Sequence, residues 1–213
     1  MDIVFSVPNL ISYIRIGLVV LAFSNFNNCI LFVGLYAASY VIHGIARIVA
    51  KLLKQETTFG NILSMIIDRS TTGSLLIMLA HICPEHKLMF ISSMVLDMMS
   101  HWYLVNSSLA LNLKDHRTPA VGEDILVTIY YHTPLLVPMT VLLCEQFYLK
   151  YYIGYFNSML WNMKEYIVML YISGGVYVLK QIIHILQIKV SLLRYITIDE
   201  DNAHKAANKV CDK

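Results

Sequence analysis

Six long apolar segments constrain this chain more than any other feature of its sequence. They cover residues 10–23, 30–50, 62–83, 88–105, 125–147 and 166–188. A helix that crosses the hydrocarbon core of a bilayer needs about 20 mainly apolar residues. The first segment is short for a full span unless it begins near Val7. We therefore predict an all-α integral membrane protein built as a bundle of six transmembrane helices.

The composition supports a membrane protein. Apolar residues make up 57% of the chain and charged residues 14%, whereas about a quarter of the residues in soluble domains are charged. The net charge is only +2, and no basic tract with interleaved aromatic residues occurs, so we expect no nucleic-acid partner. We also expect no cleavable signal peptide, because Asp2 stands where a basic region belongs and Pro8 interrupts the apolar run.

The basic residues of the connectors predict how the helices are oriented. One face collects Lys51, Lys54, Lys114, Arg117, Lys189, Arg194, Lys205, Lys209 and Lys213, and the other collects Lys87, Lys150 and Lys164. Because basic connectors stay in the cytosol, this asymmetry places both termini there. The glycosylation sequon at Asn106 then faces the cytosol, and we predict that it is unmodified.

The rest of the chain divides simply. We predict one membrane domain over residues 1–198, a polar cytosolic tail over 199–213, and an interfacial position for the aromatic segment 148–161. The four cysteines, Cys29, Cys83, Cys144 and Cys211, form neither a CxxC pair nor a zinc-ligand pattern. We interpret them as buried apolar side chains, and a bridge between Cys29 and Cys83 stays open as an alternative.

Residues 43–68 carry a spaced set of small and polar residues. In order, the set reads His43-x2-Ala46-Arg47-x2-Ala50-Lys51-x8-Gly60-x3-Ser64-x3-Asp68. This frame resembles the motif D-x2-D-G-x2-A-R-x8-G-x3-D-x3-D of the CDP-alcohol phosphatidyltransferases. An alternative register built on Gly44 is one residue short and leaves twelve residues before Gly60 instead of eight. We prefer the eight-residue register, which also places Lys51 on the arginine of the family motif.

The spacing of the family motif explains its chemistry. Residues three and four apart share one helix face, so aspartates at this spacing on two helices turn four carboxylates toward each other. Four carboxylates can hold two divalent cations, which prefer oxygen ligands and offset the charge of a pyrophosphate. In this chain only Asp68 remains of the four. Ala46 cannot bind a metal, Ser64 is a poor magnesium ligand, and His43 suits softer metals.

The residues that replace the aspartates form a different kind of surface. His43, Arg47 and Lys51 recur every four residues, so we expect them to share one face of their helix. Two interpretations stay open. Arg47 and Lys51 could bind a phosphate group without turning it over, or Arg47 could pair with Asp68 inside the bundle.

Further residues resemble the eukaryotic phosphatidylinositol synthases in particular. They are Val7-Pro8-Asn9-Leu10-Ile11, Arg15, Phe59-Gly60, Asp68-Arg69, Asp97, Ser100-His101-Trp102, Ser107-Ser108 and Tyr130-Tyr131. The resemblance implies the six-helix fold, a place in the endoplasmic reticulum membrane, and the reaction of CDP-diacylglycerol with myo-inositol to give phosphatidylinositol and CMP. It implies Mg²⁺ or Mn²⁺ as cofactor if the protein is active and none if it is a pseudoenzyme. It also implies a homodimer, or a heterodimer with an active paralogue.

The resemblance assigns a role to each motif position. Asp68 is the expected catalytic base and the one remaining metal ligand. The expected nucleotide- and phosphate-binding positions are His43, Arg47, Lys51, Gly60 and Ser64. The bound molecules would be CDP-diacylglycerol and myo-inositol, or a phosphoinositide lipid.

We predict a phosphatidylinositol-synthase-like protein of phospholipid biosynthesis that is catalytically impaired, because three of the four motif aspartates are replaced. The alternative is an active synthase with a rearranged metal site that uses Asp68 with His43. A small channel is a third hypothesis, but the motif charges gather at one helix end and no paired broken helices occur. Asp97 and His101 are four residues apart, as are Lys180 and His184. We interpret these intramembrane ionisable residues as structural, with Asp97 paired with His101 or with Lys180.

Overall fold

The computed structural model describes residues 3–111, 125–133 and 135–211, although for Asp201 and residues 203–211 only the backbone is described. The connector that carries Lys114 and Arg117 therefore lies outside the described residues. All regular structure in the described part is helical. The elements are η1 (Ile3–Phe5), α1 (Val7–Ser24), α2 (Cys29–Leu52), α3 (Thr58–Ile82), η2 (Pro84–His86), α4 (Lys87–Ala110), α5 (Ile125–His132), α6 (Leu136–Phe156), η3 (Ser158–Asn162) and α7 (Lys164–Cys211).

Local sequence signals explain where the first helices begin. α1 starts at Val7 with Pro8 in its first turn, where a missing N–H costs little, and this start gives the short first segment its full span. The Asn28 side chain accepts a hydrogen bond from the backbone N–H of Leu31 and caps α2. Thr57 caps α3 in the same way by accepting from the N–H of Gly60.

The fifth predicted segment, 125–147, is not one helix. The structure divides it into α5 and α6, which are bent by 91° at a short break. Pro134 explains the break, because a proline disfavours helical backbone at the residue before it, here Thr133. α6 then continues to Phe156, nine residues past the predicted end. If the bent pair counts as one span, the described residues hold six candidate membrane spans, which confirms the predicted all-α membrane architecture.

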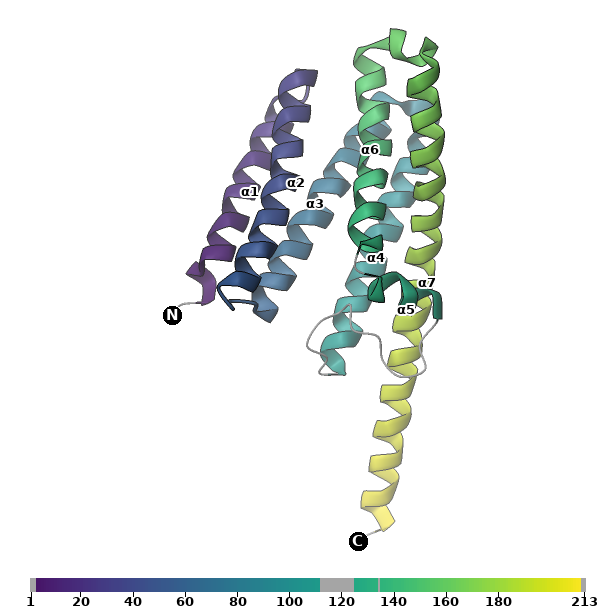
Figure 1. Cartoon of the computed structure of the whole chain (residues 1–213). Coiled ribbons are helices and arrows are strands. Elements are labelled where there is room, and N and C mark those ends of the chain that lie inside the picture. Colours follow the sequence, from purple (N-terminus) through teal and green to yellow (C-terminus); the bar gives the residue numbers. More distant parts are fainter. Residues whose placement is uncertain (1–2, 112–124, 134, 212–213) are drawn as a thin grey trace. The chain divides into compact units, whose positions relative to one another are not determined.

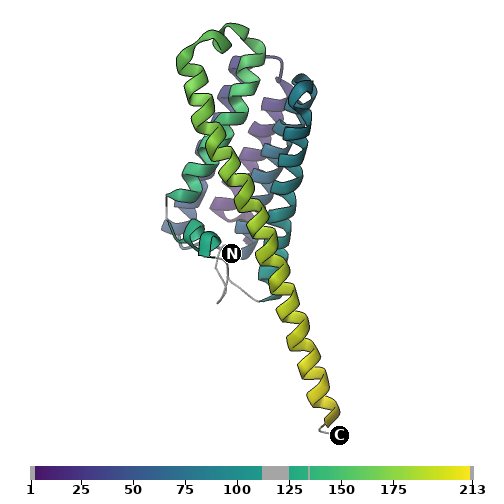
Figure 2. The same ribbon diagram turned by 90° about the vertical axis from the view of Figure 1, so that its right-hand side faces the viewer.

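The chain forms two compact units, which we describe separately. Unit 1 comprises Met1–Phe90 with Tyr148–Ile167, and unit 2 comprises Ile91–Phe147 with Val168–Lys213. In unit 1, α1 packs along α2 and also contacts α3 (Figure 1). In unit 2, α7 is the long helix that ends at the C-terminus (Figure 2). α7 passes residue 198 without a break, and the domain boundary drawn there stays a prediction.

An aromatic cluster forms one core of unit 1. The rings of Phe26, Phe32, Tyr36 and Tyr152 stack or meet at tilted angles. Tyr152 is fully buried, and its hydroxyl donates to the carbonyl oxygen of Phe26 at 2.5 Å. The segment 148–161 was predicted to be interfacial as a whole. Its first half belongs to α6, which extends beyond the predicted apolar segment, and Tyr148 and Tyr152 are buried there. The interfacial position itself stays a prediction.

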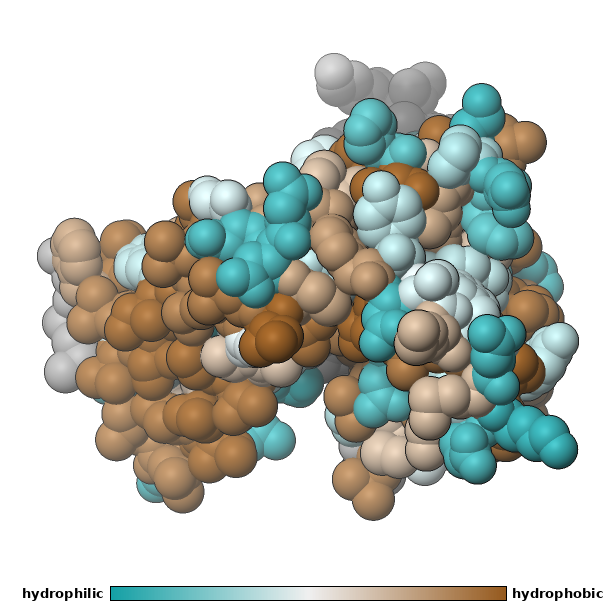
Figure 3. All heavy atoms as spheres, turned by 90° about the horizontal axis from the view of Figure 1, so that it is seen from above, coloured by the Kyte–Doolittle hydropathy of each residue, from teal (hydrophilic) through white to brown (hydrophobic). Residues whose placement is uncertain are grey.

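The outer surface is apolar and several strongly polar side chains are buried, which is the reverse of a soluble protein. Large apolar side chains such as Ile30, Leu52 and Leu88 are more than three-quarters exposed. Figure 3 shows this surface in brown over the part where α1 and α2 lie. Arg15 and Lys180 are among the buried polar residues. This distribution suits a protein whose surroundings are lipid, where polar groups find partners only inside the bundle.

Two smaller predictions are corrected. Among the described cysteines Cys144 is buried as expected, whereas Cys29 and Cys83 are partly exposed. Both are free thiols, so the bridge that stayed open as an alternative is not formed. The side chain of Cys211 lies outside the described residues. Arg194, which we counted with the cytosolic connectors, is buried in α7 and donates to the Ser108 hydroxyl at 2.6 Å.

The Tyr152 hydroxyl provides a test of the aromatic core. We expect Tyr152→Phe to lower the free energy of unfolding by about 1 kcal/mol, because the buried Phe26 carbonyl loses its donor while the ring stays in place. Unfolding in mixed micelles titrated with a denaturing detergent measures this change. Tyr155→Phe is the matched control, since Tyr155 is 54% exposed. An equal loss in both variants would contradict the assignment.

Candidate functional site

The motif residues of α2 and α3 meet inside unit 1. His43 lies on α2, and Ser64 and Asp68 lie one turn apart on the same face of α3. The Nδ1 atom of His43 is 3.2 Å from Ser64 Oγ and 3.3 Å from Asp68 Oδ1. The sequence frame thus brings together the positions that the motif spacing predicts.

A residue of α1 completes this cluster. The Arg15 guanidinium donates from Nη2 to Asp68 Oδ1 at 2.6 Å, from Nη1 to His43 Nδ1 at 2.9 Å, and from Nε to the carbonyl of Ser39 at 3.1 Å. Arg15 is 1% exposed, and the Asp68 side chain is 14% exposed. One of the two open interpretations paired Arg47 with Asp68, whereas the structure shows Arg15 in ion-pair contact with Asp68. We call Arg15, His43, Ser64 and Asp68 the motif cluster.

The hydrogen bonds of the motif cluster fix the state of His43. A guanidinium has only donors, so the Nδ1 atom that faces Arg15 must be an unprotonated acceptor. If the imidazole is neutral, its proton is therefore on Nε2. The lone pair of His43 and one oxygen of Asp68 both point at Arg15. A buried arginine at this depth is stable only with such partners.

The other motif positions lie along α2 and in the first turn of α3. Arg47 and Lys51 are exposed on α2, one helical turn apart. Gly60 is in the first turn of α3, where an added Cβ would lie 2.9 Å from Asn9 Oδ1 and 3.2 Å from Thr57 Oγ1. The close approach of these two side chains explains the glycine locally. The binding roles that the resemblance implies for these residues stay predictions.

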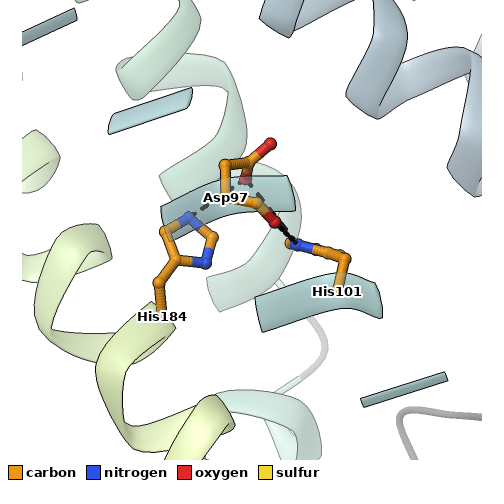
Figure 4. Close-up of side chains that lie close together, drawn as sticks. All are labelled: Asp97, His101 and His184. Carbon is orange, nitrogen blue, oxygen red and sulfur yellow. Dashed lines mark hydrogen bonds and ion pairs between the residues drawn. The ribbon is translucent and has the colours of Figure 1, made fainter. Parts of the chain in front are cut away.

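Unit 2 contains a second polar cluster, formed between α4 and α7 (Figure 4). His184 Nε2 is 3.1 Å from Asp97 Oδ1, and His101 Nδ1 is 3.7 Å from the same oxygen. The expected contact between Asp97 and His101 is present, but the nearer partner of Asp97 is His184. Asp97 and His184 are buried, as is Lys180 one turn before His184. We call Asp97, His101 and His184 the Asp–His cluster.

A polar stripe on each helix explains this second cluster. From Lys180 onward, the buried polar side chains of α7 recur at alternating spacings of four and three residues, and they are Lys180, His184, Gln187, Ser191 and Arg194. On α4 the buried side chains of Ser93, Asp97, Ser100 and Ser107 are spaced by four, three and seven residues, which keeps them on one helix face. Residues at this spacing line one face of a helix. The four-residue pairs Asp97 with His101 and Lys180 with His184 are only part of these stripes, whose spacing of three and four residues is visible in the sequence.

Comparison with known proteins identifies the family. The chain is 30% identical over 212 residues to the CDP-diacylglycerol–inositol 3-phosphatidyltransferase of Rattus norvegicus, covering 96% of this chain and 98% of that one. It is 33% identical over 161 residues to the Homo sapiens protein of that name, covering 74% of each. The Saccharomyces cerevisiae protein is 28% identical over 208 residues, with 97% and 91% covered.

No family model and no solved structure matches the chain. The similarity to these relatives nevertheless extends over most of both chains, and it confirms the resemblance inferred from the motif and the Ser-His-Trp segment. The chain therefore belongs to the CDP-diacylglycerol–inositol 3-phosphatidyltransferase family, the phosphatidylinositol synthases.

Proposed function

We propose that this protein is a catalytically impaired phosphatidylinositol synthase. It would bind the CDP-diacylglycerol headgroup between the C-terminal end of α2 and the N-terminal end of α3. The relatives support a synthase-like role in phospholipid biosynthesis, and their names give CDP-diacylglycerol and inositol as substrates. The observation that carries the proposed impairment is the replacement of three of the four motif aspartates, which leaves Asp68 as the one carboxylate of the motif cluster. Asp68 is ion-paired with Arg15, with 2.6 Å between Nη2 and Oδ1.

The motif cluster does not fit the pair of divalent cations that the family motif implies. Its side chains offer one carboxylate, one imidazole and one hydroxyl, and the carboxylate is already neutralised by Arg15. Hard cations such as Mg²⁺ are held by several oxygens, usually more than one carboxylate. Two such ions would also stand beside a fixed guanidinium charge. We therefore assign no step of a reaction to a metal at this position.

The groups that could accept a proton are also occupied. A transferase must remove the proton of the inositol hydroxyl as that hydroxyl attacks phosphorus. Asp68 Oδ1 and the Nδ1 lone pair of His43 both accept hydrogen bonds from Arg15. In this arrangement the other ring nitrogen of a neutral His43 carries the proton. While Arg15 stays where it is, its positive charge makes the Asp68 carboxylate a weaker base and occupies the Nδ1 lone pair of His43.

Binding of a phosphate-containing headgroup does not require His43 or Asp68 to accept a proton. Arg47 and Lys51 project from one face of α2 and are exposed. A guanidinium and an ammonium group bind phosphate oxygens by charge-assisted hydrogen bonds, which are stronger than neutral ones. These two residues would bind the pyrophosphate of a CDP-lipid, or the phosphates of a phosphoinositide. We further propose an endoplasmic reticulum location with both termini cytosolic, and a dimer with itself or with an active relative.

One observation favours a second candidate function, an active synthase with a rearranged site. Arg15 faces Asp68 and His43 together, so a pyrophosphate that attracted the guanidinium would release both groups at once. His43 Nδ1 and Asp68 Oδ1 are 3.3 Å apart, which is close enough to share a proton taken from inositol. In this alternative Arg15 supplies the positive charge that metals supply in the family motif.

Turnover distinguishes the two candidates. The purified chain, expressed in a host without its own synthase, is incubated with CDP-diacylglycerol, labelled inositol and Mn²⁺ or Mg²⁺. We expect no more labelled lipid than from Asp68→Asn, because a single motif carboxylate cannot hold the two divalent cations that the family motif implies. Labelled lipid that disappears in Asp68→Asn would contradict impairment and support the rearranged site.

Binding is tested separately, in lipid nanodiscs that contain CDP-diacylglycerol or lack it. Each charge-assisted contact contributes about 1.5–3 kcal/mol, so Arg47→Ala and Lys51→Ala should each weaken CDP-diacylglycerol binding by about tenfold or more. Lys87→Ala, which also removes an exposed cation from unit 1, is the matched control and should bind normally. Equal affinity in all variants would exclude Arg47 and Lys51 from the headgroup site.

A further inference from the structure

We propose that Asp97, His101 and His184 bind one divalent transition-metal ion of the zinc class inside unit 2. The ligand atoms of the three residues lie within 4.8 Å of one another. A tetrahedral ion with bonds of about 2.0–2.1 Å separates its ligands by about 3.4 Å. The 3.1 Å between His184 Nε2 and Asp97 Oδ1 and the 3.7 Å between His101 Nδ1 and Asp97 Oδ1 are close to that spacing. His101 Nδ1 is also 2.9 Å from the backbone carbonyl oxygen of Asp97, to which it donates a hydrogen bond, so metal binding requires the tautomer of His101 that carries its proton on Nε2.

The strongest argument is the state of His184. Its Nδ1 atom is 3.1 Å from Gln187 Oε1, which is an acceptor, so Nδ1 carries a proton. In a neutral imidazole Nε2 then holds a lone pair, and it faces a carboxylate oxygen that is also an acceptor. His184 is 2% exposed, and among the described residues Nε2 has no hydrogen-bond partner. Two facing acceptors in a buried site require a proton or a cation between them.

The surroundings of His184 resemble those of a metal-bound histidine. Such a histidine normally donates its second ring nitrogen to an oxygen atom, which fixes the ring. Here Gln187 Oε1 and the Ser100 hydroxyl both lie within hydrogen-bond distance of Nδ1. Gln187 is held in turn, because its Nε2 donates to the Tyr131 hydroxyl at 2.5 Å. These contacts aim the remaining nitrogen of His184 at Asp97.

The side chains indicate which class of ion would bind. Two imidazoles and one carboxylate suit zinc and its transition-metal neighbours, whereas Mg²⁺ and Ca²⁺ prefer oxygen ligands. Lys180 is buried one turn from His184 and interacts with it electrostatically. That positive charge opposes any cation, so binding must depend on coordination by nitrogen. Three protein ligands would leave one coordination position open. This inference does not rest on the proposed function, since all three ligands lie outside the motif cluster.

Metal content tests the proposal directly. The full chain, purified in detergent without a polyhistidine tag, is loaded with Zn²⁺ or Co²⁺, freed of excess ion and assayed by mass spectrometry. We expect about one ion per chain, and visible d–d absorption typical of four-coordinate Co²⁺. His184→Ala, His101→Ala and Asp97→Asn should each lose the ion. His86→Ala, which removes an exposed histidine of unit 1, and Asp68→Asn should keep it.

A second variant covers the case in which the ligand variants fail to fold. Gln187→Leu removes the acceptor that orients His184 but none of the ligands, and we expect metal affinity to fall about 10- to 100-fold. Absence of bound metal in the wild-type chain would overturn the proposal and leave a protonated His184 paired with Asp97. Equal metal content in wild type and His184→Ala, or unchanged affinity in folded Gln187→Leu, would overturn it as well.

Discussion

The buried guanidinium of Arg15 organises unit 1. Its three donating nitrogens reach Ser39 and His43 on α2 and Asp68 on α3, so one side chain of α1 joins the first three helices. A charge at this depth has no water to solvate it, and removal of any partner would leave a polar group unpaired. The same contacts that stabilise the helices also occupy the groups on which the proposed chemistry would depend. The Asp68 oxygen and the His43 nitrogen that bind Arg15 are thus the same atoms that a proton transfer would use.

Unit 2 uses the same physical solution in a different form. Between α4 and α7 the interior is lined by serine, histidine, glutamine and charged side chains, while many large aliphatic side chains face outward. Helices in a bilayer gain little from burying apolar side chains against each other, because lipid tails are equally apolar. Hydrogen bonds such as Arg194 to Ser108 and Ser100 to His184 can hold the helices together there. The polar stripes of α4 and α7 thus hold the helices of this unit together, as apolar side chains do in the core of a soluble domain.

The sequence predicted the features that depend on residues close together in the chain, such as helices and shared helix faces. It did not predict contacts between residues that are far apart in the chain. Apolar length located the helices, and four-residue spacing brought Ser64 and Asp68 onto one face opposite His43. The partner of Asp68 is 53 residues away on α1, and no local pattern identifies it. One signal was available, since Arg15 is the only charged residue within Val7–Ser24 and must find a counter-charge.

Two other misses have local causes. The break between α5 and α6 follows from Pro134, whose effect on Thr133 outweighs the apolar length of the segment. The contact of His184 with Asp97 joins two helices that are distant in the chain, so the spacing within either helix could not reveal it. The roles of the motif residues in binding and catalysis depend on bound molecules, which neither helix spacing nor packing specifies.

The uninterrupted course of α7 has a mechanical consequence. A helix of 48 residues is about 72 Å long, whereas the hydrocarbon core of a bilayer is about 30 Å thick. About 40 Å of the helix therefore lies beyond that core. A rigid rod of this length acts as a lever, so a tilt of about 10° within the membrane would move its far end by about 7 Å. Small rearrangements around the Asp–His cluster would thus be amplified at the C-terminal end of the helix.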